Sequence, residues 1–167
     1  MSEEAELESA ILALLGRLLA EEIDAELLEV LHTSGIAEIF EDIEPGCLKV
    51  ELNAATAEYQ RLFTPPEGKF PVASNWASGS DDGEIVELVE DIEATLGLNL
   101  PRDLPLDHAS VLLPLMGWLV ENQPTATSQF FEVAFKPWLS QFAAALSDNA
   151  ELPIYRATAR LLAEMTE

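Results

Sequence analysis

The sequence predicts an all-α fold, a single-domain helical bundle of about six to eight helices. Apolar residues recur at steps of three and four along most of the 167-residue chain, which is the period of an amphipathic helix. No segment shows the alternation of apolar and polar residues that is typical of a pair of strands. Because 49% of the residues are hydrophobic, a chain of this length can bury a core and is not expected to be disordered.

Four helices are expected in residues 1–63. Ser2 is predicted to cap the first and Asp24 the second, because these side chains can accept hydrogen bonds from backbone N–H groups of the first turn. The third helix is short and covers residues 36–43, and the fourth begins near residue 48 or 53 and ends at Phe63. The apolar positions of the first helix show the helical spacing: Leu7, Ile11, Leu14, Leu15, Leu18 and Leu19.

A long loop rich in proline and glycine is expected over residues 64–83. About twenty residues without a helix or strand are uncommon in a compact domain and usually have a function. Trp76 lies in this loop, where no buried helix face requires an aromatic residue. An amphipathic helix is predicted over residues 84–97, with apolar residues on one face and acidic residues on the other.

A hinge that contains two prolines is expected at residues 98–106, before the C-terminal helices at 107–167. Asp107 is predicted to cap the first of these helices, which ends near residue 122. A helical segment at residues 128–147 is interrupted by a proline. Pro153 suits the first position of the last helix, because proline has no backbone N–H to leave unpaired there.

The net charge is −23, from 31 acidic and 8 basic residues. Such a charge repels phosphate backbones and anionic lipid, so the sequence predicts no binding of nucleic acid and no stable membrane insertion. The longest apolar run, residues 111–120, is about half of what a membrane-spanning helix needs. The acidic N-terminal residues do not resemble a secretory or transit peptide, so a cytoplasmic location is expected.

Motifs of catalysis and of cofactor binding are absent from the sequence. It contains no P-loop, no GxGxxG after a strand, no GxSxG and no HExxH. Cys47, His32 and His108 are far apart along the chain, which disfavours both a zinc site and a Cys–His nucleophile. We therefore expect no enzymatic activity, no metal and no cofactor.

Four short segments, in order along the chain, carry a family resemblance. They are residues 58–66 (EYQRLFTPP), residues 104–108 (LPLDH), the aromatic stretch 130–142 with its Lys-Pro-Trp run, and residues 152–157 (LPIYRA). Together these segments resemble the TorD/DmsD/NarJ family of redox-enzyme maturation chaperones, and most closely its DmsD-like branch.

The resemblance implies a chaperone that binds the twin-arginine leader and the precursor of a molybdoenzyme catalytic subunit, and assists its maturation before export. A twin-arginine leader presents two guanidinium groups followed by an apolar stretch. Its receptor therefore needs carboxylates together with an apolar, aromatic groove. The chain is expected to be a monomer, or a homodimer in which the C-terminal helices are exchanged at the hinge.

The same resemblance gives six candidates for leader binding: Tyr59, Phe63, Trp76, Pro105, Asp107 and His108. Tyr59 and Phe63 are four residues apart and share one helix face. In this role Asp107 would pair with a leader arginine, and His108 would donate to a leader carbonyl. Simpler roles stay open, because Asp107 also suits an N-cap and the two aromatic residues also suit a core.

Several other residues are interpreted from their surroundings. Trp118 and Trp138 lie on continuous apolar faces and are expected in the core, and Arg61 is expected to form an internal ion pair. Leu104 stands where the family has glutamate, and Ala134 where it often has histidine. These two departures leave the affinity for a leader open.

An alternative function is that of an acidic helical protein which occupies a basic site on another protein, as a nucleic-acid mimic or an adaptor. A mimic needs spread charge and no apolar groove, so Trp76 and the proline-rich loop favour the chaperone. A GTP-hydrolysing maturation factor is disfavoured by the missing P-loop. Residues 81–93 hold seven acidic residues and no basic one, which would attract a basic leader at long range without making its binding specific.

Overall fold

The computed structural model describes residues 3–63, 76, 81–100 and 104–166, and within these ranges the chain forms nine α-helices and one short 3₁₀-helix. The predicted all-α class is confirmed. The helices are α1 (Glu3–Ala20), α2 (Ala25–Leu31), α3 (Ile36–Ile43), α4 (Leu52–Phe63), α5 (Asp81–Leu96), α6 (Ala109–Asn122), η2 (Pro124–Ala126), α7 (Thr127–Ala134), α8 (Leu139–Asn149) and α9 (Pro153–Met165).

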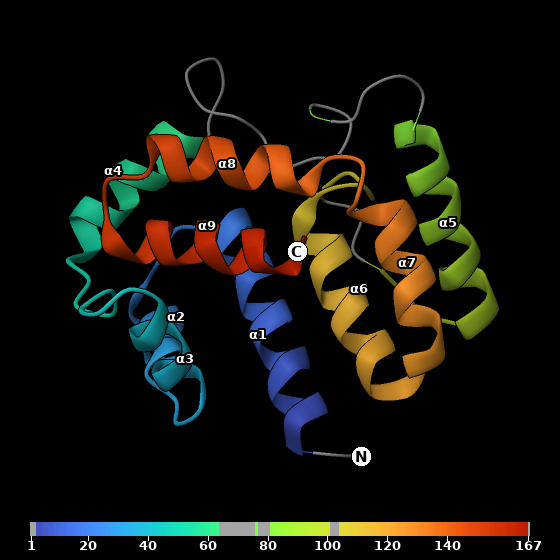
Figure 1. Cartoon of the computed structure of the whole chain (residues 1–167), viewed down its shortest axis with the longest axis horizontal. Coiled ribbons are helices and arrows are strands. Elements are labelled where there is room, and N and C mark those ends of the chain that lie inside the picture. The colour runs from blue at the N-terminus through green and yellow to red at the C-terminus, as the bar shows by residue number, and fades with distance from the viewer. Residues whose placement is uncertain (1–2, 64–75, 77–80, 101–103, 167) are drawn as a thin grey trace.

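The helices α1, α6 and α7 lie side by side, with α5 beyond α7 at the edge of the molecule (Figure 1). The pair α1–α6 has the most extensive contact, because small residues let the two backbones approach. A Cβ atom built on Gly117 would lie 3.1 Å from the backbone oxygen of Ser9, and one on Gly16 would lie 3.1 Å from the ring of Pro114. This close packing fixes the positions of the two helices relative to each other.

The helices α8 and α9 form a hairpin that lies across one end of this layer, with α4 beside it and α3 packed on α9 (Figure 1). The core beneath the hairpin is rich in aromatic residues. Phe40, Phe135, Trp138 and Tyr155 have no exposed surface. The prediction that Trp138 is a core residue is therefore confirmed, whereas Trp118 is only half-buried.

Local signals predicted several helix ends correctly. Asp24 caps α2 by accepting a hydrogen bond from the backbone N–H of Leu27 at 2.8 Å, and α3 covers the predicted residues. Gly97, just after α5, has a φ of +69°, which glycine adopts at little cost at a helix C-terminus. Pro153 is the first residue of α9, as expected.

Other predictions need correction or fall outside the described residues. The helix α5 begins at Asp81, so the last three residues of the predicted loop 64–83 are helical. A break at residues 135–138 separates α7 from α8, which raises the number of helices in the described ranges above the predicted eight. Ser2, most of the predicted loop and residues 101–103 of the predicted hinge are not among the described residues.

Among the helices of the described ranges, none is both long and apolar enough to cross a membrane.

Candidate functional site

The C-terminal half of α4 attaches this helix to the turn between α8 and α9. The side chain of Glu58 is buried, and its Oε2 accepts hydrogen bonds from the backbone N–H groups of Glu151 at 3.1 Å and Leu152 at 2.7 Å. Arg61 Nη2 lies 2.9 Å from Glu58 Oε1 and donates to the carbonyl oxygen of Asn149 at 2.7 Å. The predicted internal ion pair of Arg61 is confirmed. The role of Glu58 was not predicted, because its backbone partners lie 93 and 94 residues further along the chain.

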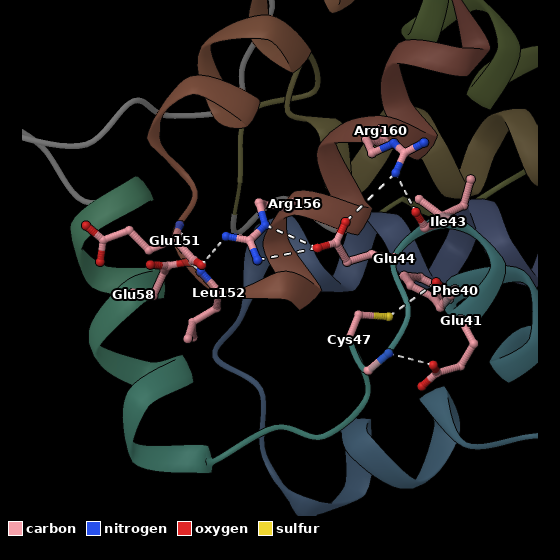
Figure 2. Close-up of polar contacts among 11 residues, drawn as sticks. Phe40, Glu41, Ile43, Glu44, Cys47, Glu58, Glu151, Leu152, Arg156 and Arg160 are labelled. Carbon is pink, nitrogen blue, oxygen red and sulfur yellow. Dashed lines mark hydrogen bonds and ion pairs between the residues drawn. The ribbon is translucent and has the colours of Figure 1, made fainter.

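A second polar contact joins the end of α3 to α9, as Figure 2 shows. Arg156 lies 3.4 Å from Oε1 of Glu44, and Arg160 lies 3.8 Å from Oε2 of the same carboxylate. Arg160 also donates to the carbonyl oxygen of Ile43. These arginines are therefore engaged within the fold, as Arg61 is.

Cys47 lies in the same region, just after α3 (Figure 2). Its thiol is buried and donates to the carbonyl oxygen of Phe40 at 3.3 Å. Burial, together with the negative charges of Glu41 and Glu44, raises the pKa of Cys47 to about 11. At neutral pH the group is a protonated thiol that packs in the core, and not a nucleophile.

Tyr59 and Phe63 lie against each other, as their spacing predicts. Their ring centroids are 5.1 Å apart, and Phe63 makes an edge contact with Tyr155 of α9 at 6.0 Å. Phe63 is buried and belongs to the core, whereas Tyr59 is half-buried. Burial and the negative charges of Glu22 and Glu21 raise the pKa of Tyr59. Tyr59 is therefore a partly accessible ring with two carboxylates nearby.

Trp76 packs against α8. Its ring centroid lies 5.5 Å from that of Phe142, which also contacts the buried Trp138 at 5.8 Å. The side chain of Trp76 is half-buried, so part of the indole remains accessible. Its neighbours in the chain, 64–75 and 77–80, lie outside the described residues.

Pro105, Asp107 and His108 lie at the start of α6, where the structure corrects the predicted cap. The N-cap is His108 and not Asp107, because His108 Nδ1 accepts a hydrogen bond from the backbone N–H of Ser110 at 3.0 Å. A turn closed by the hydrogen bond from His108 N to Pro105 O, at 3.0 Å, moves the start of the helix one residue along.

The three side chains at the start of α6 differ in how accessible they are to a partner. Asp107 is 5% exposed and His108 is 1% exposed, whereas Pro105 is exposed. Burial lowers the pKa of His108 to about 4, against the opposing effect of the Asp107 charge. The imidazole is therefore neutral at pH 7, as its role as an acceptor at Nδ1 requires.

The structure thus divides the six predicted residues by accessibility. Tyr59, Trp76 and Pro105 keep side-chain surface that a partner can reach, whereas Phe63, Asp107 and His108 lie inside the fold. Among the described residues, Tyr59 and Phe63 contact each other within α4. Trp76 instead contacts Phe142 of another helix, α8.

A groove that was not predicted is lined mainly by α1 and the C-terminal part of α9, with Ile39 of α3, Met116 of α6 and Phe131 of α7 completing it; we call it the α1–α9 groove. Its volume is about 470 Å³. Apolar side chains that are only partly buried form much of its lining: Leu7, Ile39, Met116, Phe131 and Met165. An adjoining hollow of about 340 Å³ shares Glu4, Glu8 and Met116 with it and continues to Thr127.

Three carboxylates, those of Glu4, Glu8 and Glu164, line the α1–α9 groove, and no lysine or arginine does so among the described residues. All three side chains belong to exposed residues. Within the described part of the chain none of them has an ion-pair partner. Glu4 and Glu8 lie one turn apart on the same face of α1, a rise of about 6 Å.

Another groove, of about 380 Å³, lies between α5, α6 and α7. Its lining mixes apolar residues such as Leu88, Ile92 and Phe130 with polar side chains, among them one carboxylate: Asp91, Thr95, Gln123 and Gln129. In the ranges that the structure describes, no group of three or more His, Cys, Asp or Glu side chains could hold a metal ion.

Known proteins resemble this chain in both sequence and structure. The family model of the nitrate reductase delta subunit matches residues 31–144. A protein of Haemophilus influenzae, described only as uncharacterized, is 34% identical over 120 residues; the match covers 71% of this chain but only 61% of that relative's length. A crystal structure of a candidate redox enzyme maturation protein from Archaeoglobus fulgidus superposes with a TM-score of 0.66, over 94% of this chain and 92% of that one, at 25% identity.

Proposed function

Because the chain belongs to the nitrate reductase delta subunit family, we propose that it is a cytoplasmic maturation chaperone, and not an enzyme, that serves a molybdenum-cofactor oxidoreductase. The observation that carries this proposal is the family match over residues 31–144, a range that contains all six residues predicted for leader binding. The structural similarity to a candidate redox enzyme maturation protein supports the same class.

The finer part of the proposal is that the chaperone binds the twin-arginine leader of the catalytic subunit's precursor before export, as the DmsD-like branch does. Two properties of the chain support it. The net charge of −23 attracts a basic segment, and Arg61, Arg156 and Arg160 are already engaged with the chain's own carboxylates. The half-buried aromatic rings and the grooves offer apolar surface to the stretch that follows the arginines.

The predicted residues have unequal roles in this proposal. Tyr59 offers a partly accessible ring that can stack against a cationic side chain of the leader or of the precursor behind it. Trp76 and Pro105 offer accessible apolar surface to the same leader or precursor. Asp107 and His108 hold the start of α6 and would meet a leader only if this segment opened.

A peptide-binding experiment tests the proposal. A synthetic peptide with an Arg-Arg pair followed by an apolar run should bind more tightly than the same peptide with Ala-Ala, and also more tightly than one with Lys-Lys. Arginine binds carboxylates through two parallel hydrogen bonds, which lysine cannot form. Isothermal titration calorimetry measures the affinities. Equal affinity for the Arg-Arg peptide and for a scrambled peptide of the same charge would overturn leader recognition.

The variant Asp107→Ala tests whether this residue binds the leader. If Asp107 is a ligand, its loss weakens binding of the Arg-Arg peptide while the melting temperature stays unchanged. If Asp107 only supports the fold, the melting temperature falls and peptide affinity survives. Competition between the protein and DNA for a basic partner is the matching test of the mimic, the alternative function.

A further inference from the structure

We propose that the α1–α9 groove is the surface that holds the leader, with the arginine pair at Glu4 and Glu8 and the apolar run over Met116 and Phe131. This inference rests on the proposed function. It assigns the arginine pair and the apolar run to a surface that contains none of the six residues predicted from the sequence. The accessible ones among those six, Tyr59, Trp76 and Pro105, would then contact the precursor outside this segment.

The fold leaves several apolar side chains of the groove partly uncovered. Met116 and Phe131 lie on neighbouring helices, α6 and α7, and Met165 at the end of α9 faces the same groove. Each of these three side chains is packed on the core along one side and exposed along another. Methionine adapts its shape to different apolar partners, so a groove of this composition suits apolar segments of varied sequence.

The same groove is lined by carboxylates. Glu4 and Glu8 are exposed and have no ion-pair partner among the described residues, so they keep their full capacity to accept from guanidinium groups. Glu164 adds a third carboxylate from α9. No basic side chain of the described ranges lines the groove, and a cation would therefore meet no repulsion there.

The shape of the groove favours a peptide segment over a compact ligand. The adjoining hollow shares Glu4, Glu8 and Met116 with the groove and continues along α6 to Val120 and the start of α7. The two carboxylates therefore lie between the apolar lining of the groove and a hollow whose lining is mixed, with Ala5, Val120 and Pro124 beside Thr127. A second copy of this chain is disfavoured as the occupant, because each copy carries a net charge of −23 and like charges repel.

The close packing of α1 on α6 relates Glu4 and Glu8 to Met116. Gly117, one residue after Met116, lets the backbone of Ser9 approach, one residue after Glu8. The acidic and the apolar parts of the proposed site are thus fixed relative to each other by direct backbone packing. A site that is formed before binding loses less conformational entropy when the peptide binds.

The double variant Glu4→Gln/Glu8→Gln tests the electrostatic part. It should bind the Arg-Arg peptide about tenfold more weakly than the wild type in a buffer of low salt, because two charge-assisted contacts become weaker. Its affinity for the Ala-Ala peptide should be unchanged. The matched control is Glu26→Gln/Glu29→Gln on α2, which changes the net charge equally at exposed positions away from the groove, and it should stay within about twofold of the wild type.

The variant Met116→Gln tests the apolar part. It should weaken binding of the Arg-Arg and Ala-Ala peptides by the same factor, about fivefold, since apolar burial is lost in both. Leu52→Gln, which changes an exposed apolar residue at the start of α4, is the matched control and should bind as the wild type does.

The outcomes separate this inference from the proposed function. If the wild type does not distinguish Arg-Arg from Ala-Ala, leader recognition itself is wrong. If the wild type distinguishes them and the groove variants bind as their controls do, only the placement in the α1–α9 groove is wrong. A change in sedimentation of Met116→Gln with unchanged peptide affinity would show that the groove joins two copies of the chain, and would also overturn the placement.

Discussion

The same chemical group, a glutamate side chain, has opposite surroundings in two regions of this molecule. At the junction of α4 with the α8–α9 turn, Glu58 is buried and accepts hydrogen bonds from two backbone N–H groups and from Arg61. In the α1–α9 groove, Glu4 and Glu8 are exposed and, within the described residues, have no basic partner. The first carboxylate is occupied by the fold, and the other two remain available to a ligand.

A chain of net charge −23 thus uses acidic residues for two purposes. A buried carboxylate has to be satisfied internally, because leaving it or its partners unpaired is costly. An exposed carboxylate contributes little to stability, so it can be kept for binding. The largest expected effects on stability therefore lie at Glu58, and the smallest lie at the groove.

The largest effect is expected for Glu58→Ala. The substitution leaves the backbone N–H groups of Glu151 and Leu152 and the Arg61 guanidinium without their acceptor, which should lower the free energy of unfolding by about 3 kcal/mol. Urea denaturation measures this loss. Glu58→Gln keeps one acceptor oxygen and should lose about half as much. A loss below about 0.5 kcal/mol for Glu58→Ala would show that the junction is not held by this carboxylate.

A somewhat smaller effect is expected for Gly117→Ala, which tests whether the groove is built on rigid packing. The new Cβ atom would lie 3.0 Å from Oγ and 3.1 Å from the backbone oxygen of Ser9, so α1 and α6 must separate slightly. The free energy of unfolding should fall by about 1 to 2 kcal/mol. The control Gly83→Ala in α5 meets no atom within 4 Å and should be neutral or slightly stabilising. Equal behaviour of the two variants would argue against a tight α1–α6 contact.

His108 extends the buried side of the comparison to pH. Its pKa is lowered to about 4 by burial, so between about pH 6.5 and 4 the unfolded chain binds a proton that the folded chain does not. Stability should therefore fall as the pH decreases through this range, by about 1 kcal/mol between pH 7.5 and 6. His108→Asn keeps a side chain that can cap α6 and should lose this part of the pH dependence. If the free energy of unfolding depends on pH in the same way in the wild type and in His108→Asn, the imidazole of His108 is not buried and neutral in the folded chain.

The smallest effect on stability is expected at the groove itself. Glu4→Gln/Glu8→Gln should change the free energy of unfolding by less than about 0.5 kcal/mol, because exposed and unpaired side chains contribute little. Binding of the Arg-Arg peptide by the wild type should instead weaken with salt, since screening shortens the Debye length from about 10 Å at 0.1 M to about 3 Å at 1 M. Affinity that does not change with salt would place the arginines away from exposed carboxylates.

Much of the fold could be predicted because helix ends depend on local sequence. Asp24, residues 36–43 and Pro153 all behave as their neighbours in the chain predict. The cap of α6 was misplaced by one residue, because the turn at Pro105 decides which side chain reaches the first free N–H group. Trp118 was expected in the core, but α6 presents it at the margin, where it is half-buried.

The candidate site was less predictable because its contacts are not local. Glu58 is part of a recognised motif, yet its partners are 93 and 94 residues away. The α1–α9 groove joins residues near both ends of the described chain, such as Glu4 and Met165, to the middle of α6 and α7. No pattern within one helix could show that these faces meet.

The measurement that tests this account most directly determines both the free energy of unfolding and the affinity for the Arg-Arg peptide in two variants, Glu58→Gln and Glu4→Gln/Glu8→Gln. We predict that each variant changes only one quantity: the first lowers stability and keeps peptide affinity, and the second keeps stability and binds about tenfold more weakly. Loss of peptide affinity in Glu58→Gln, with full affinity in the groove variant, would contradict the account.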